Sequence, residues 1–127
     1  MSSTGLHEDP SQLRPETTDR HRAIVSLMEE LEAVDWYGQR IDATSDPELR
    51  GILTHNRDEE KEHACMVLEW IRRHDECFDV YLRRYLFTSG AIEEIEKVQE
   101  ADEAGGSDPR LDQSGTLRIG SLRSAEA

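Results

Sequence analysis

The sequence predicts an all-α protein, and three observations lead to that prediction. Two long stretches, residues 16–43 and 47–74, carry apolar residues at the three- and four-residue spacing of amphipathic helices. Between them, Ser45-Asp46-Pro47-Glu48 is a helix-start signature, in which a capping residue precedes a proline and an early acid. The alternating Val, Ile, Tyr and Thr runs that mark strands are missing. Two long helices joined by so short a turn form an antiparallel hairpin.

The segments around the hairpin are predicted from prolines, glycines and polarity. Residues 1–15 are polar and contain two prolines, so we expect a disordered N-terminus. The second helix either continues past residue 74 or breaks near Asp75, and a Thr-Ser-Gly sequence at 88–90 is a stop signal. A short acidic C-terminal helix follows at 91–104. The expected divisions are therefore a helical domain at 16–104 and a linker with a tail at 105–127.

Such a hairpin has an apolar face that nothing large in the same chain can cover. A second copy of the chain would bury this face most simply, as a two-fold four-helix bundle. We therefore expect a homodimer as the basic unit of assembly.

Composition and charge exclude several classes of function. The 127 residues carry a formal net charge of −13, which repels nucleic acid and anionic membranes and attracts cations. No apolar run is long enough to span a bilayer, and the first residues lack the apolar core of a secretory signal. Cys65 and Cys77 would lie about 18 Å apart on one helix, too far for a disulfide within the chain. We expect free thiols in a reducing cytosol.

The strongest chemical signal is a Glu-x-x-His step at Glu60 and His63, which puts a carboxylate and an imidazole side by side on one helix face. On a helical projection, His63 lies in the middle of the apolar stripe of its helix and Glu60 lies about 60° from it. On the first helix, Glu30 and Tyr37 lie about 60° and about 80° from Leu27, at the flank of the apolar sector.

Burying carboxylates costs free energy, and a bound metal ion offsets that cost directly. Mixed carboxylate and imidazole ligands suit iron or manganese, and zinc is a further option. Ferritin-like di-iron bundles use two Glu-x-x-His units and two lone glutamates, whereas this chain supplies one of each, in Glu60, His63 and Glu30. The pattern therefore predicts half of a di-metal site, completed by a second chain. The alternative is a hydrogen-bonded core histidine with a glutamate at the edge of the stripe.

Other side chains near this site have weaker assignments. Tyr37 is close enough along its helix to line a metal site at Glu30, although packing is the commoner role of aromatic residues. Glu29 and Glu32 project away from the apolar face. They form either a solvated helix face or a weak outer cation site.

The C-terminal tail carries spaced apolar residues after a flexible linker. Residues 114–123 read SGTLRIGSLR, in which Leu117, Ile119 and Leu122 are separated by polar residues and glycine. A tethered extended segment with a few apolar anchors is typical of a docking peptide.

The residues described above resemble a known family, the encapsulated ferritins. The resemblance is carried by HRAIVSLMEELEAVDWYGQR (21–40), HNRDEEKEHACMVLEWIRRHDE (55–76) and YLFT (85–88), and it covers most of residues 16–95. The tail sequence TLRIGSLR resembles the targeting peptide of encapsulin cargo proteins.

The resemblance implies more than the spacing does. Members of that family are helical hairpins that dimerise into a ferritin-like four-helix bundle, and the dimers assemble into a ring-shaped homodecamer. The ligands of the di-iron ferroxidase centre would be Glu30, Glu60 and His63 of both chains, with Tyr37 nearby. An outer metal-attraction site would match the residues Glu29, Glu32 and Trp36.

These expectations lead to one functional hypothesis and two alternatives. The hypothesis is a ferroxidase that oxidises Fe(II) to Fe(III) at two irons per dimer interface, inside an encapsulin nanocompartment of the bacterial cytoplasm. Residues 114–123 would bind the encapsulin shell protein. The alternatives are a non-catalytic metal-binding protein with the same site and a structural helical adaptor that docks through its tail.

Overall fold

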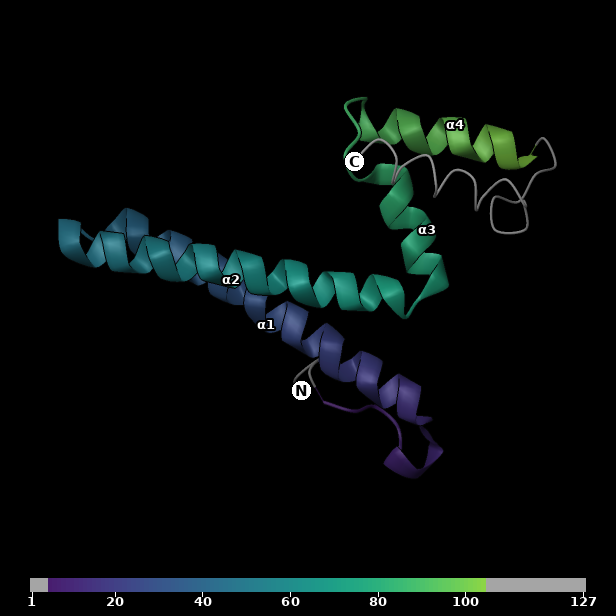
Figure 1. Ribbon diagram of the computed structural model, residues 1–127, viewed down its shortest axis with the longest axis horizontal. Helices are drawn as coiled ribbons and strands as arrows, with labels where there is room; N and C mark the ends of the chain where they lie inside the picture. The colour runs from purple at the N-terminus through teal and green to yellow at the C-terminus, as the bar shows by residue number, and fades with distance from the viewer. Residues whose placement is uncertain (1–4, 105–127) are drawn as a thin grey trace. The chain divides into compact units, whose positions relative to one another are not determined.

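The computed structural model describes residues 5–104, and every regular element in that range is a helix (Figure 1). The predicted all-α fold class is therefore confirmed. Within that range no helix combines the length and the apolar content needed to cross a membrane. Residues 114–123 lie outside the described range. The elements are a short 3-10 helix, η1 (Pro10–Gln12), and four α-helices, α1 (Pro15–Ala43), α2 (Pro47–Arg73), α3 (Glu76–Tyr85) and α4 (Ile92–Ala104).

The turn between α1 and α2 is fixed by capping at both of its ends. The Asp46 side chain accepts a hydrogen bond from the Leu49 N–H at 3.2 Å, which begins α2. The Arg50 guanidinium donates to the carbonyl oxygens of Ile41, at 3.3 Å, and of Thr44. These bonds satisfy carbonyls that the end of α1 leaves without helical partners. A three-residue turn with both ends capped allows α2 to run back alongside α1 in one register.

The structure decides where the second long helix ends. Helix α2 stops at Arg73, and the Asp75 side chain accepts a hydrogen bond from the Phe78 N–H at 2.9 Å to start α3. Asp75 thus caps a new helix. Of the two possibilities that the sequence left open, the second long helix breaks near Asp75. At the other end of the chain, η1 gives local structure to part of segment 1–15, where the sequence predicts none.

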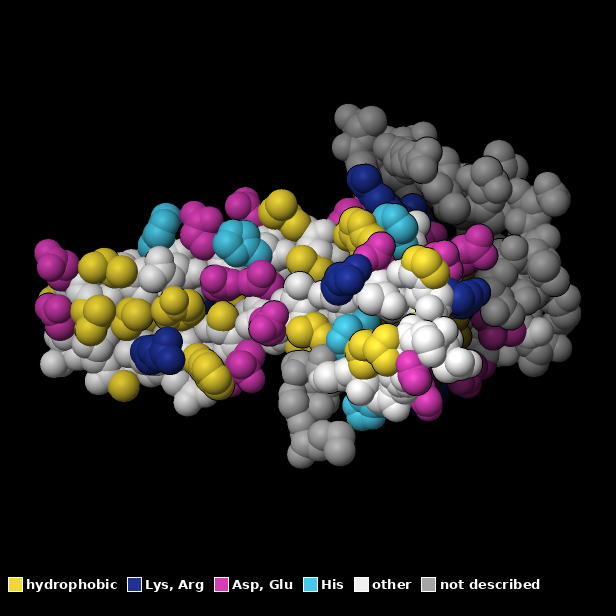
Figure 2. All heavy atoms as spheres, turned by 90° about the horizontal axis from the view of Figure 1, so that it is seen from below, with side chains coloured by type: hydrophobic (Ala, Val, Ile, Leu, Met, Phe, Trp, Pro, Cys, Tyr) yellow, Lys and Arg dark blue, Asp and Glu magenta, His cyan; other side chains and the backbone are white. Residues whose placement is uncertain are grey.

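Packing within the hairpin buries little apolar surface. Ala64 and Ile71, both on α2, are the only buried hydrophobic residues in the described part of the chain. Figure 2 shows hydrophobic side chains exposed along the surface of the two long helices. Because burying one such side chain fully stabilises a fold by about 1.5–3 kcal/mol, this face favours association with another surface. The exposed large apolar residues on α1 and α2 are Ile24, Met28, Leu31, Trp36, Leu49, Ile52 and Met66.

The chain divides into two compact units, Met1–Phe78 and Asp79–Ala127, and the predicted helical domain 16–104 extends across that boundary. In the second unit, Arg84 of α3 forms an ion pair with Glu103 of α4 at 2.9 Å. Cys65 and Cys77 are both exposed free cysteines, as expected, but they lie on different helices, α2 and α3, so the single-helix spacing assumed from the sequence is wrong. All of the residues expected at the metal site lie in the first unit.

Candidate metal centre

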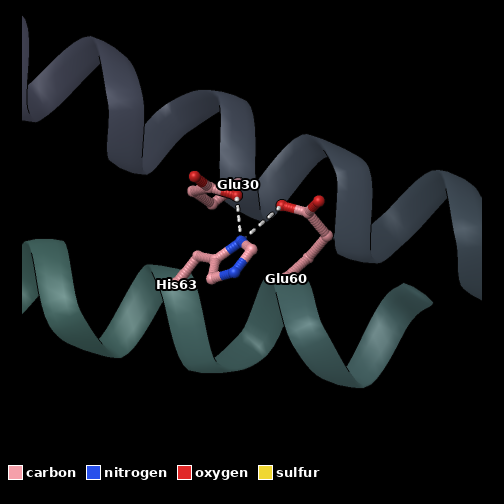
Figure 3. Close-up of side chains that lie close together, drawn as sticks. All are labelled: Glu30, Glu60 and His63. Atoms are coloured by element: carbon pink, nitrogen blue, oxygen red, sulfur yellow. Dashed lines mark ion pairs between the residues drawn. The ribbon is translucent and has the colours of Figure 1, made fainter. Parts of the chain in front are cut away.

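Three residues predicted to bind metal lie together between the two long helices. Glu30 projects from α1, whereas Glu60 and His63 project from α2 (Figure 3). One ligand atom from each residue lies within 4.8 Å of the other two. The His63 Nδ1 atom is 3.6 Å from Glu60 Oε2 and 3.8 Å from Glu30 Oε2. The antiparallel hairpin thus brings a carboxylate from one helix to a Glu-x-x-His step on the other.

The cluster is half-buried on one side and open on the other. The Glu30 and Glu60 side chains are 23% and 26% exposed, whereas the His63 side chain is 46% exposed. Leu49 and Ile52 fall within about 40° of His63 on a helical projection of α2, and both are also exposed. The imidazole therefore lies on the uncovered apolar face of the hairpin, where an associating surface would meet it.

The two carboxyl groups affect one another electrostatically. A hydrogen bond with Glu60, together with partial burial and the Glu60 charge, raises the pKa of the Glu30 carboxyl above its ordinary value. The nearby His63 acts in the opposite direction, but the raising effects prevail. Two carboxylates this close repel each other when both are ionised. A divalent cation between them would offset that repulsion.

Tyr37 does not join the cluster within one chain. In residues 5–104 it forms no hydrogen bond with Glu30, Glu60 or His63, and the Arg40 guanidinium lies 5.5 Å from the centre of its ring. A role for Tyr37 at the site stays a prediction that would need a change of rotamer or a second chain.

The residues predicted for an outer site all lie on α1. Glu29 and Glu32 are exposed on α1, and Trp36 is 49% exposed. Across the described range, the cluster at Glu30, Glu60 and His63 is the one group of three metal-type ligands that converges. An outer cation site therefore stays a prediction.

The structure brings a further acid, Glu59, close to His63, and sequence reasoning assigned this residue no role. Glu59 Oε2 lies 4.0 Å from His63 Nε2, on a different edge of the ring from the other two carboxylates. Glu59 Oε1 lies 3.5 Å from His55 Nε2. The signal was present in the sequence as a His-Glu-His row with four-residue spacing on one helix.

Comparison with known proteins identifies the family. The family model described as EncFtn-like matches residues 5–89, which include all of the predicted ligands. The chain belongs to the EncFtn-like family. The resemblance to encapsulated ferritins found in the sequence is thereby confirmed.

Individual relatives are similar over most of their length. An encapsulated ferritin-like protein of Rhodospirillum rubrum is 55% identical over 131 residues, covering 100% of this chain and 94% of that protein. The encapsulin nanocompartment cargo protein EncC of Myxococcus xanthus is 33% identical and covers 84% of this chain and 86% of its own length. A crystal structure of a Nitrosomonas europaea protein is 61% identical, with a TM-score of 0.68 over 69% of this chain and 97% of that chain.

The residues of this EncFtn-like protein fit a hard or borderline metal ion. Two carboxylates and one imidazole provide the mixed oxygen and nitrogen donors found in iron and manganese sites. One chain offers three donor residues, fewer than the six of a complete ferritin-like pair of metal sites. The donor set therefore fits one half of such a centre.

The raised pKa of Glu30 predicts a specific pH dependence of apo-protein stability. Between the ordinary glutamate pKa and the raised value, the folded state binds more protons than the unfolded state, so stability falls as pH rises through that interval. Glu30→Gln should remove this loss and stabilise the apo-protein most above the interval. Thermal unfolding in chelator from about pH 4 to about pH 7 measures the difference. A difference that stays constant over this range would contradict the assignment.

Proposed function

We propose that this protein is a ferroxidase that oxidises Fe(II) to Fe(III) at a di-iron centre formed between two copies of the chain. The observation that carries the proposal is the convergence of Glu30, Glu60 and His63 within 4.8 Å of one another. Iron is both the substrate and the occupant of this centre. When bound there, it supplies the electrons that dioxygen or peroxide accepts.

Each side chain has a distinct part in holding the irons. Glu60 would hold both irons as a shared carboxylate, Glu30 would hold one of them, and His63 would supply the nitrogen ligand. Binding requires both carboxylates in their anionic form, so the raised pKa of Glu30 predicts weaker metal binding as pH falls. Partial burial of the two acids strengthens their attraction for the cation, because less water screens it.

Two features support completion of the site by a second chain. The donor set is half of the ferritin-like complement, and the site borders an apolar face that the chain leaves exposed. A two-fold dimer would cover this face and bring two sets of ligands together. Family resemblance further implies a ring-shaped homodecamer of these dimers, with Tyr37 near the irons and Glu29, Glu32 and Trp36 forming an outer site that attracts cations.

The relatives support a location inside a protein shell. The Rhodospirillum rubrum protein is named as encapsulated, and the Myxococcus xanthus protein is named as encapsulin nanocompartment cargo. We infer that this chain is also cargo of an encapsulin shell in the bacterial cytoplasm and that residues 114–123 bind the shell. An open ring has no closed cavity, so the surrounding compartment would store the oxidised iron.

Substitution of the proposed ligands tests the chemistry. Glu60→Ala and His63→Ala should each lower the initial rate of Fe(II) oxidation by about 100-fold or more, since even the loss of a residue behind a ligand costs 10–100-fold. Glu29→Ala should leave the centre intact and alter iron uptake. Stopped-flow absorbance after mixing with Fe(II) and air measures the rates. Glu62→Ala, on the exposed side of the same helix, is the control, and equal rates in all variants would exclude this centre.

The half-site arrangement predicts that assembly creates metal affinity. Because one chain carries half of the ligands, iron should be bound by even-numbered oligomers and should be absent from monomers. Native mass spectrometry with and without Fe(II), over a series of protein concentrations, resolves the species. A monomer that binds two irons tightly would contradict the shared centre.

The tail should target the protein to the encapsulin shell. Deletion of residues 111–127 should leave helicity, assembly and Fe(II) oxidation unchanged and should abolish co-purification with a co-expressed encapsulin shell. Serine at Leu117, Ile119 and Leu122 should have the same effect, since each anchor contributes about 1.5–3 kcal/mol when fully buried. Loading of the truncated chain at the wild-type level would show that these residues do not dock.

A further inference from the structure

His63 has carboxylates at both of its ring nitrogens. Glu30 Oε2 and Glu60 Oε2 lie 3.8 Å and 3.6 Å from Nδ1, while Glu59 Oε2 lies 4.0 Å from Nε2. A neutral imidazole carries one N–H and one lone pair, and only the nitrogen with the lone pair can bind a metal. The neighbours of the ring therefore decide which nitrogen is available.

We propose that Glu59 is a positioning residue, which holds the N–H of His63 at Nε2 and leaves the Nδ1 lone pair facing Glu30 and Glu60. This inference deepens the proposed function and rests on it. Histidines that bind metals commonly donate their other N–H to a carboxylate, which fixes the tautomer and the ring orientation. Within residues 5–104, Glu59 is the acid paired with Nε2.

The opposing carboxylates make this role necessary. Before metal binds, Glu30 and Glu60 can accept an N–H from Nδ1, which would favour the tautomer that cannot bind at that nitrogen. Glu59 favours the tautomer that carries the N–H at Nε2 instead. The present separation of 4.0 Å is an ion-pair distance, and the tautomer role requires the half-exposed Glu59 side chain to rotate into hydrogen-bond range.

His55 keeps Glu59 in line with His63. Its Nε2 lies 3.5 Å from Glu59 Oε1, so the two oxygens of one carboxylate face two imidazoles, each one helical turn away. This contact holds Glu59 along α2 and away from the Nδ1 side of the ring. Glu59 is also outside the group of ligand atoms that converges within 4.8 Å. The arrangement therefore favours support of His63 over direct metal binding.

Histidine NMR of the metal-free, full-length protein tests the proposal without any catalytic step. Long-range ¹H–¹⁵N spectra at about pH 8, where ordinary histidines are neutral, report the tautomer of His63. The wild type should carry its N–H at Nε2. Glu59→Ala should increase the Nδ1–H population, and His55→Ala should shift it in the same direction by a smaller amount. Glu62→Ala removes the same charge from an exposed position of the same helix and should leave the tautomer unchanged.

Zn(II) binding provides the second readout, by calorimetry on the same variants. Glu59→Ala should weaken binding by about 10–100-fold, the usual effect of losing the carboxylate behind a histidine ligand. Weaker binding with an unchanged tautomer would overturn the proposal, since it would indicate that Glu59 binds the metal or acts by charge alone. An unchanged tautomer and unchanged affinity would also overturn it. If the variants show the expected tautomer shift but the wild-type protein fails to oxidise Fe(II), the ferroxidase proposal alone would be refuted.

Discussion

The register of α1 against α2 is the constraint on which the rest of the first unit depends. A turn of only three residues, capped by Asp46 and Arg50, leaves the two helices little freedom to slide past one another. This register sets Glu30 opposite the Glu60–His63 step. A slip of one residue would rotate Glu30 by about 100° around its helix and separate the carboxylates. The cluster is thus a consequence of hairpin geometry and needs no specialised loop.

Charge balance explains why the cluster is arranged in this way. The hydrogen bond with Glu60, partial burial and the Glu60 charge raise the pKa of Glu30, so ionising both acids of the metal-free cluster costs free energy that a bound cation would offset. Folding is stabilised elsewhere, by helix caps and by the packing around Ala64 and Ile71. Holding Glu30 and Glu60 together costs free energy only at this contact, so the hairpin can remain stable. Metal affinity and apo-protein stability are therefore opposed at Glu30.

The hairpin also leaves part of its apolar surface uncovered. Large side chains such as Leu31, Ile52 and Met66 remain exposed on its long helices within residues 5–104. The half-exposed imidazole of His63 lies on this same face. An incomplete apolar core and an incomplete ligand set thus occur at one surface. A single association event could complete both, and this would couple metal binding to assembly.

The sequence by itself determined the features that depend on neighbouring residues in one helix. Helical periodicity, the Asp46-Pro47 start and the Glu60–His63 step are local, because residues three and four apart share a helix face in any α-helix. The all-α class and the start of the second long helix followed from them, and the resemblance to encapsulated ferritins followed from the longer residue runs. The tertiary structure decided that Glu30 meets Glu60 and His63, because this contact depends on the register between two helices. It also decided that the second long helix ends and that Asp75 caps a new one. The Tyr37–Arg40 and Glu59–His63 pairs have spacings that are visible in the sequence. The rotamers that bring them into contact are not visible there, because packing selects among several that the local sequence allows.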